Sequence, residues 1–267
     1  MPAKKIPIAL TIAGSDPGGG AGIQADLKTF HQFRVFGTSA ITALTAQNTR
    51  GVFGVHAVPV DFVRAELDAL ADDLPPAAMK SGMLATRELV DAVAGWVGGR
   101  RSVPYVLDPV MVSTSGHRLL DADAEAAVRT RLVPLATVVT PNLDEAELLV
   151  GHPVRDAAAM ERAGAALLAL GARAALIKGG HLEGSALVDL LVTPAAAVRY
   201  ERPRIATTST HGTGCTLSAA IAAGLAHGRP LERAVADALD FVARAIASAP
   251  GLGGGHGPLE HFAECPS

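Results

Sequence analysis

The sequence predicts a single α/β domain in which helices cover both faces of a mostly parallel β-sheet, with an antiparallel hairpin at one sheet edge. Short apolar runs alternate with amphipathic helical patterns along nearly the whole chain, and this alternation is typical of parallel sheets. Of the 267 residues, 49% are hydrophobic and only 4% are aromatic, so Ala, Val and Leu must fill the core. No linker or internal repeat divides the chain. We therefore expect one domain over residues 1–267, with loop-like termini at residues 1–5 and about 250–267.

The individual elements follow from the spacing of the apolar residues. The predicted strands are residues 6–14, 38–47, 55–60, 77–84, 105–111, 136–142 and 174–180. The predicted helices are residues 22–33, 61–73, 86–97, 121–133, 143–150, 156–170, 212–227 and 230–248. In the second helix, Asp61 is the expected N-cap, and Phe62, Leu67 and Leu70 are expected to face the core. Residues 187–193 and 196–205 follow each other without a helix between them, which predicts the edge hairpin.

Charge and cysteine content argue against several classes of protein. The formal net charge is −3 and no run of basic residues exceeds two, so nucleic-acid binding is not expected. The two cysteines form no CxxC motif, which favours a reducing cytoplasm. Residues 4–14 have the form of a short signal peptide, but they lead directly into a glycine-rich loop, so we interpret them as a buried first strand. No apolar run approaches the ~20 residues of a membrane helix.

Candidate ligand-binding loops follow the predicted strands, because ligands of open α/β sheets bind outside the carboxyl ends of the strands. These loops are residues 14–22, 47–51, 82–84, 108–116, 140–145, 179–184 and 210–215.

The first of these loops is rich in glycine and opens a helix, which suits a phosphate or a close approach of backbone to a ligand. It matches neither of two common fingerprints. A GxGxxG motif beginning at Gly18 would require glycine where Ile23 stands, and no Gly-Lys-Ser/Thr triplet follows. The alternative is a mobile turn without a ligand.

A second glycine turn, HGTGC at residues 211–215, precedes an Ala-rich helix. Its glycines leave backbone N–H groups free to converge on an anion. Cys215 then lies in the first helical turn, where we expect the helix dipole to lower the thiol pKa below its usual ~8.5. The alternative is a buried and inert cysteine.

Polar residues at other strand ends complete the candidate site. Lys178 could neutralise phosphate oxygens, unless it is a solvated surface lysine. Asp108 and the segment containing Asn142 and Asp144 could hold Mg²⁺ through waters, although helix capping equally explains Asn142 and Asp144. Gln47 can pair with the edge of a nitrogen-containing ring, but a turn is the simpler explanation of its motif.

Together these motifs resemble the hydroxymethylpyrimidine and phosphomethylpyrimidine kinases, a branch of the ribokinase-like kinases. The resemblance runs from about residue 8 to residue 262. It is carried by ALTIAGSDPGGGAGIQADLKTF (9–30), ITALTAQNTRGV (41–52), SGML (81–84), LDPVM (107–111), TPNLDEAELL (140–149), IKGGH (177–181) and THGTGCTLSAAIAA (210–223). The first segment and HGTGC are the most specific of these.

The resemblance implies a ribokinase-like three-layer α/β/α domain that uses ATP and Mg²⁺. The implied activity is phosphorylation of 4-amino-5-hydroxymethyl-2-methylpyrimidine and then of its monophosphate to the diphosphate, in thiamin biosynthesis. The implied partners are the pyrimidine and ATP, with no nucleic acid or membrane partner, and the protein is expected to be a homodimer.

The resemblance also assigns roles to residues of the candidate loops. The implied pyrimidine pocket consists of Gly14, Asp26, Gln47, Met83 and Val110. Asp108 and Glu145 match positions near the metal. The residues implied near the phosphates are Asn142, Lys178, His211, Gly212, Thr213 and Gly214. Cys215 and Lys178 are the implied catalytic residues, with Cys215 standing where many ribokinase-like enzymes have an Asp that acts as a base.

Three alternatives remain at this stage. Pyridoxal or pyridoxine kinases of the same branch also carry the Cys turn, so such an activity is the nearest alternative. A non-catalytic ligand sensor on this fold is the second. A dinucleotide-binding oxidoreductase is disfavoured by the failed fingerprints.

Overall fold

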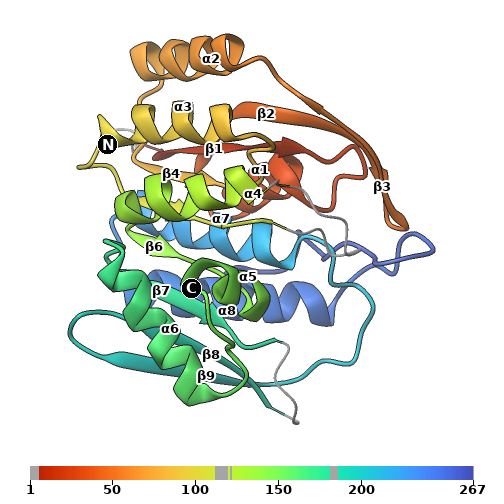
Figure 1. Cartoon of the computed structure of the whole chain (residues 1–267). Helices are drawn as coiled ribbons and strands as arrows, with labels where there is room; N and C mark the ends of the chain where they lie inside the picture. The colour runs from red at the N-terminus through yellow and green to blue at the C-terminus, as the bar shows by residue number, and fades with distance from the viewer. Residues whose placement is uncertain (1–5, 112–119, 121, 181–185, 267) are drawn as a thin grey trace, which may run out of the picture.

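The computed structural model describes residues 6–111, 120, 122–180 and 186–266. Figure 1 shows one central sheet with helices packed along it. The strands, in the sheet order β3-β2-β1-β4-β5-β6-β7-β8-β9, have the following bounds: β1 (Ile8–Ser15), β2 (Phe36–Asn48), β3 (Gly51–Ala57), β4 (Ala78–Ser81), β5 (Tyr105–Leu107), β6 (Val138–Val139), β7 (Ala175–Lys178), β8 (Ala186–Val192) and β9 (Ala197–Pro203). The centre of the sheet, from β2 to β7, is parallel, as the sequence predicts.

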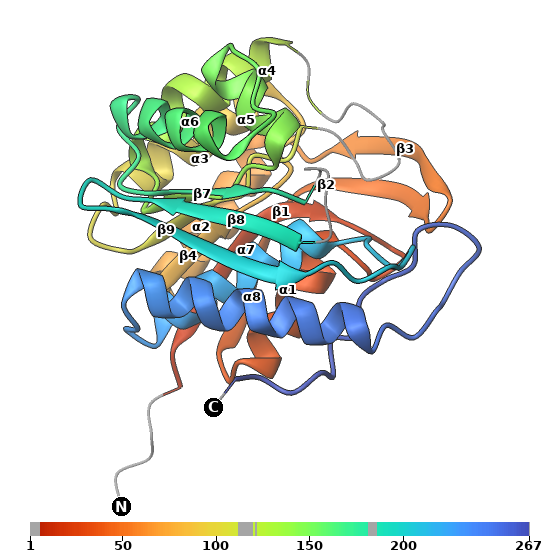
Figure 2. The ribbon, with the colours of Figure 1, turned by 90° about the horizontal axis from the view of Figure 1, so that it is seen from below.

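The helices lie on both faces of the sheet, and Figure 2 shows α3, α4, α5 and α6 on one side with α1, α7 and α8 on the other. Their bounds are α1 (Gly22–Gln32), α2 (Val60–Asp73), α3 (Arg87–Gly98), α4 (Ala122–Ala127), α5 (Leu143–Val150), α6 (Ala157–Ala169), α7 (Thr213–Ala226) and α8 (Leu231–Ala247). After α4 the chain continues as a π-helical turn (Val128–Leu132) and a 3₁₀ turn (Val133–Leu135). The three-layer α/β/α architecture expected from the sequence is therefore confirmed.

Two hydrophobic cores lie on the two faces of the sheet. Because successive residues of a strand point to opposite faces, Leu10 and Ile12 of β1 join the core with α2 to α6, whereas Ala9 joins the core with α1, α7 and α8. Small side chains bring α7 close to its neighbours, and a Cβ at Gly224 would lie 2.8 Å from the Cβ of Ala234 in α8. The abundance of alanine and scarcity of aromatics in the sequence thus correspond to close helix packing.

Antiparallel hairpins occupy both edges of the sheet, and only one of them was predicted. The β8–β9 hairpin is the expected one. At the other edge, β2 pairs with β3 through a turn at Thr49 and Arg50, where the sequence analysis placed a loop and a separate strand at residues 55–60. The side chain of Asn48 accepts the N–H of Arg50 at 2.9 Å. This local bond closes a tight turn that apolar periodicity does not report.

Two predictions for α2 were wrong, namely Asp61 as its N-cap and Phe62 as a core residue. The helix begins at Val60 after Pro59 and has no side-chain cap, so Asp61 lies in the first turn instead. Phe62 is 60% exposed and Val63 is fully buried. Val63, Leu67 and Leu70 share the i, i+4, i+7 spacing of one helix face, and Phe62 falls outside that stripe.

Strands at the centre of the sheet are shorter than predicted. β5 ends at Leu107 instead of continuing to Met111, because Pro109 offers no N–H and the N–H of Val110 turns back to the carbonyl of Asp108 at 2.8 Å. Asp108 therefore lies just beyond the carboxyl end of β5, near the centre of the sheet. The expected helix start at Asp121 and the motif residue His181 lie outside the described residues.

Residues 250–266 of the C-terminal tail contain no helix or strand, as expected, but they are hydrogen-bonded to the rest of the molecule. The N–H of His256 donates to the carbonyl of Thr49 at 2.8 Å, and the N–H of His211 donates to the carbonyl of Gly257 at 3.1 Å. The ring Nε2 of His261 lies 3.1 Å from the hydroxyl of Thr216 in α7. The tail therefore connects the β2–β3 hairpin to the start of α7. In the part of the chain that the structure describes, no helix is both long and apolar enough to cross a membrane.

Because of His261 in the tail, we expect the free energy of unfolding to decrease at acid pH. Burial, assisted by Lys28 and opposed by Glu260, lowers the pKa of His261 to about 4, whereas a histidine in the unfolded chain titrates near ~6.5. The unfolded state binds this proton first, so His261 costs stability as the pH falls from ~6.5 towards 4, up to ~2 kcal/mol at pH ~5.

His261→Gln keeps a polar contact with Thr216 and does not titrate. Between pH 7 and pH 5 the urea midpoint of the variant should fall less than that of the natural protein. Equal acid sensitivity in both proteins would contradict the assignment.

Candidate functional site

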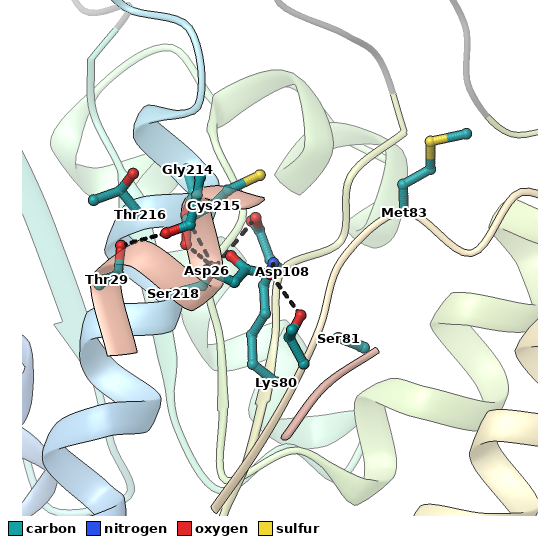
Figure 3. Close-up of polar contacts among 12 residues, drawn as sticks. Asp26, Thr29, Lys80, Ser81, Met83, Asp108, Gly214, Cys215, Thr216 and Ser218 are labelled. Carbon is teal, nitrogen blue, oxygen red and sulfur yellow. Dashed lines mark hydrogen bonds and ion pairs between the residues drawn. The ribbon is translucent and has the colours of Figure 1, made fainter. Parts of the chain in front are cut away.

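The candidate site lies where the carboxyl ends of the parallel strands meet the N-terminus of α7. Figure 3 shows Asp26, Lys80 and Asp108 beside the Gly214–Cys215 turn, with Met83 set apart from them on the right. These residues come from α1, β4, the ends of β5 and β4, and α7. The sheet thus brings together most of the loops that the sequence analysis selected.

A buried charge cluster forms the centre of the site. The ammonium Nζ of Lys178 lies 3.3 Å from Asp108 Oδ1 and 3.9 Å from Glu145 Oε2. Only 15% of the Lys178 side chain is exposed, so Lys178 is not a solvated surface lysine. Asp108 also accepts hydrogen bonds from the hydroxyls of Thr140 and Ser218, each at 3.4 Å. This position under the N-terminus of α7 suits Lys178 for holding negative charge.

Glu145 is positioned by a helix cap. Its carboxylate accepts the N–H of Asn142 at 2.8 Å, and the Asn142 side chain accepts the N–H of Glu145 at 2.9 Å, which together form a capping box. Burial raises the pKa of Glu145 to about 7, with Asp108 adding to the rise and Lys178 opposing it. Asp144 lies outside the cluster on the surface, 3.4 Å from Arg155. Capping therefore does explain Asn142, and it also aims Glu145 at Lys178.

The carboxylates are suited to a Mg²⁺ ion that arrives with a nucleotide. Among the described residues, no group of three or more His, Cys, Asp or Glu side chains could hold a metal by itself. Asp108 and Glu145 are two buried carboxylates, 3.3 and 3.9 Å from the Lys178 ammonium. Mg²⁺ is usually held by one or two carboxylates, with waters and substrate phosphates completing its coordination. The donor set fits that arrangement.

The two glycine loops pack against each other. Gly212 is the N-cap of α7 with φ 82°, and a Cβ there would overlap the carbonyl oxygen of Gly20. Gly22 has φ 56°, and a Cβ there would overlap the carbonyl oxygen of Gly14. Side chains other than glycine are strained in this conformation, so both positions require glycine. The first loop is therefore a bonded part of the site and not an isolated turn.

Asp16, which the sequence analysis missed, ties these loops together. Its carboxylate accepts N–H groups of Gly18, Gly20 and Ala21 and lies 2.8 Å from Nε2 of His211. Burial raises its pKa, but hydrogen bonds from His211 and Gln47 outweigh burial and lower the pKa to about 2. An Asp directly before Pro-Gly-Gly is a recognised turn former, and that was the signal available in the sequence.

A second missed residue, Lys80, pairs with Asp26. Both side chains are fully buried, with Nζ 2.8 Å from Asp26 Oδ2. The hydroxyl of Thr11 donates to the same oxygen at 2.5 Å, while Asp26 Oδ1 has no partner among the described residues. Lys80 lies inside a predicted strand, one residue before the SGML motif, and a charged residue within a buried strand was its signal.

The expectation that Cys215 has a depressed pKa was wrong. The side chain is partly buried beside Asp26 and Asp108, and burial together with these carboxylates raises its pKa to about 11. Lys80 and the N–H of Gly22 act in the opposite direction but do not compensate. The sequence places Cys215 in a helical first turn but does not report the desolvation and the carboxylates around it.

The residues implied for the ring pocket lie at one side of this cluster. A Cβ at Gly14 would lie 3.4 Å from the sulfur of Met83, and Met83 is 9% exposed. Val110 and Gln47 are both half-buried. The structure thus brings Gly14 next to Met83, and it brings Gln47 next to Asp16.

A separate cavity of about 480 Å³ lies between α2, α3 and α4. Arg87 and Arg131 there pair with Asp91 at 3.7 and 3.3 Å, on the surface. No residue of the candidate site lines this cavity.

Comparisons with known proteins agree with the fold and identify the family. The family model described as phosphomethylpyrimidine kinase matches residues 16–260. The chain is 52% identical over 260 residues to a hydroxymethylpyrimidine/phosphomethylpyrimidine kinase of Rhizobium meliloti, covering 96% of this chain and 97% of the relative. It is also 50% identical over 253 residues to a thiamine biosynthesis bifunctional protein of Geobacter sulfurreducens, covering 95% of this chain and 52% of that longer protein.

A solved structure extends the agreement to three dimensions. An ADP complex of Bacillus subtilis pyridoxal kinase superposes with a TM-score of 0.91 at 39% identity, covering 97% of this chain and 98% of the other. The fold and the buried charge cluster define a ribokinase-like small-molecule kinase. Within that class, the chain belongs to the phosphomethylpyrimidine kinase family.

The raised pKa of Cys215 predicts slow alkylation. With a pKa of about 11, the thiolate is scarce at neutral pH, so iodoacetamide should label Cys215 roughly 10²-fold more slowly at pH ~7.5 than it labels a free thiol. The rate should still be rising at pH ~10.

Mass spectrometry of the labelled peptide in a Cys265→Ser background measures this rate for one thiol. A labelling midpoint below pH ~8.5 would restore the low-pKa interpretation.

Proposed function

We propose that this protein is an ATP- and Mg²⁺-dependent kinase of thiamin biosynthesis. It phosphorylates 4-amino-5-hydroxymethyl-2-methylpyrimidine and then the monophosphate to the diphosphate. The observation that carries the proposal is an open helix N-terminus beside a buried cation and carboxylate: a Cβ on Gly214 would lie 3.2 Å from Lys178 Nζ and 3.6 Å from Asp108 Oδ2. The family membership supports the choice of substrate.

The phosphates are proposed to bind at the start of α7. The N–H groups in its first turn have no intrahelical acceptor, and Gly212, Thr213 and Gly214 leave this end open to an anion. Lys178 adds positive charge at the same point, where it would stabilise charge that grows on the transferring phosphoryl group. Asn142 and His211 would flank the nucleotide, with the His211 ring held by Asp16 at 2.8 Å. Asp108 and Glu145 would hold Mg²⁺, which supplies neutralisation of phosphate charge.

Proton removal from the alcohol is proposed to involve Cys215. With a pKa of about 11, only a small fraction of Cys215 is thiolate at neutral pH. In that fraction the thiolate would take the proton of the alcohol and become the thiol, while the alcohol oxygen bonds to the γ-phosphorus and ADP leaves. Because the reactive fraction is small, positioning and charge stabilisation contribute most of the rate.

The pyrimidine ring is proposed to lie between Gly14, Met83 and Val110. Gly14 permits a close approach of the ring to backbone, and the Met83 thioether packs against aromatic faces and edges. Gln47 would pair with the ring edge, and Asp26 would accept a hydrogen bond through its unpartnered oxygen.

A cytoplasmic homodimer is part of the same proposal. Both cysteines are unpaired, which is consistent with a reducing compartment. The homodimer rests on the family resemblance.

Pyridoxal phosphorylation is the second candidate, favoured by the structural match to pyridoxal kinase. Steady-state assays coupled to ADP release should compare the pyrimidine alcohol, its monophosphate and pyridoxal. We expect kcat/KM for the pyrimidine to exceed that for pyridoxal by roughly 10-fold or more. A preference for pyridoxal would reject the proposed substrate.

Two variants separate charge stabilisation from substrate binding. Lys178→Met removes a cation whose partner charge grows towards the transition state, so kcat should fall by roughly 10²-fold with a smaller change in the pyrimidine KM. Gln47→Ala should instead raise the pyrimidine KM by about 10-fold and leave the ATP KM nearly unchanged. Steady-state kinetics on folded protein measure both. A Lys178→Met enzyme with normal kcat would remove Lys178 from the mechanism.

A further inference from the structure

We propose that Lys80 is a positioning residue for phosphoryl transfer: from beneath the site, it keeps the Asp26 carboxylate charged and oriented with one oxygen free for the substrate, and it sets positive charge below Cys215. The inference rests on the proposed function and deepens it, because it assigns a role to a residue that does not itself reach the substrate.

The position of Lys80 next to Asp26 is fixed by the sheet, because β4 is paired on both sides. Lys80 lies in β4 in register with Thr11 of β1 on one side and Val106 of β5 on the other. Its Nζ and the hydroxyl of Thr11 both bond to Oδ2 of Asp26, at 2.8 and 2.5 Å. The two donors hold one carboxylate oxygen and leave Oδ1 without a partner.

An unpartnered buried carboxylate oxygen needs an explanation, because buried polar atoms are nearly always hydrogen-bonded. Asp26 is fully buried, and Figure 3 shows it between Lys80 and the Gly214–Cys215 turn. Asp26 is also close enough to Cys215 to raise the pKa of its thiol, so we infer that Asp26 Oδ1 accepts a hydrogen bond from an alcohol bound at Cys215. The orphan oxygen is the expected state of an acceptor whose donor is the substrate.

Gly82, in the loop after β4, leaves space for the ammonium of Lys80. A Cβ at Gly82 would lie 2.9 Å from Lys80 Nζ, so a larger residue there would displace the charge. Fully buried lysines are rare, and a well-packed apolar side chain often stabilises a core as well as a buried ion pair does. Core stability alone is therefore a weak reason for Lys80 at this position.

The charge of each partner depends on the other. Burial raises the pKa of Asp26, and Lys80 is the main group that opposes this rise. Burial is the largest single influence on Lys80 and disfavours its charged form, but Asp26, Cys215 and Asp108 together outweigh burial and raise the pKa of Lys80. Tyr105 is the further titratable group that senses the Lys80 charge. Removing the ammonium would remove the main group that opposes this rise, so the pKa of Asp26 would rise further.

The same ammonium acts on Cys215. Burial raises the thiol pKa, and Lys80 makes the largest contribution in the opposite direction. Lys80 thus favours the thiolate form of Cys215, which is the form that takes the proton of the alcohol in the proposed reaction.

The test is Lys80→Met, assayed on folded protein with the pyrimidine alcohol and MgATP from pH 6 to 9. We expect kcat/KM for the pyrimidine to fall by roughly 10²-fold at pH ~7 and to recover as the pH rises and Asp26 ionises. The ATP KM should be nearly unchanged. In the Lys80→Met/Asp26→Asn double variant the loss should remain at every pH, because no carboxyl is left to titrate.

Tyr105→Phe is the matched control. It removes a fully buried hydroxyl, 2.5 Å from the Ser81 hydroxyl, from the strand beside Lys80 without removing a charge. It should lower the thermal midpoint and leave kcat/KM and its pH profile unchanged. If Lys80→Met behaves in the same way as Tyr105→Phe, Lys80 is structural only and the inference is wrong.

Two further outcomes are informative. If Lys80→Met does not fold, Lys80→Gln retains a donor to Asp26 without the charge, and it should show the same loss with recovery at high pH; a normal profile overturns the inference. If the unmutated protein phosphorylates pyridoxal and not the pyrimidine, the proposed substrate is wrong. The same Lys80 variants would then be assayed with pyridoxal. No turnover of any of these alcohols would reject the proposed function and the inference together.

Discussion

The close contact between the two glycine loops is the constraint on which the rest of the site depends. The carbonyl of Gly20 occupies the space that a Cβ of Gly212 would need, so the start of α7 can approach the loop after β1. That approach sets Cys215 near Asp26 from α1, and it sets Gly214 near Lys178 from the end of β7. Residues almost 200 positions apart along the chain, such as Asp16 and His211, then close the arrangement.

Charge burial is the second organising feature, and it is costly. Taking Asp26, Lys80, Asp108, Lys178 and Glu145 out of water is unfavourable unless each charge is paired. The structure pairs them in two groups, Asp26 with Lys80 and Lys178 with Asp108 and Glu145. The pairing is incomplete at one carboxylate oxygen, and the pKa values of Glu145 and Cys215 are raised to about 7 and about 11. A site of this kind is poised to gain from ligands that bring hydrogen-bond donors and phosphate charge.

The likeness to both pyrimidine and pyridoxal kinases has a physical basis in the same site. Both substrates present a hydroxymethyl group on a flat nitrogen-containing ring. In the proposed function the charge cluster and the α7 turn act on the alcohol and the phosphates, and these features would not distinguish between the rings. Selection must come from groups beside the ring, of which Gln47 and Met83 are the described candidates. Fold similarity alone therefore does not decide between the two activities.

The sequence by itself determined the architecture and most of the site's location. Apolar periodicity is a local property, so the alternating strands and helices and the β8–β9 hairpin could be predicted. Helix capping was the alternative explanation for Asn142 and Asp144, and the structure shows it at Asn142, with Glu145 as its partner. The rule that ligands bind beyond the carboxyl ends of strands then selected the loops with Asp108, Lys178 and the glycines. The β2–β3 turn and the buried face of α2 were missed, because one side-chain hydrogen bond and a shift of one residue decide them.

Only the tertiary structure decided which charges are buried and what they contact. Lys80 and Asp26 are 54 positions apart, and nothing local in either segment reports their pairing. Asp16 likewise finds His211 only through the meeting of the two loops. Cys215 shows the limit most clearly. A helix start predicts a low thiol pKa from local dipoles, but desolvation and the neighbouring carboxylates raise it, and these depend on the three-dimensional surroundings, which the local sequence does not encode.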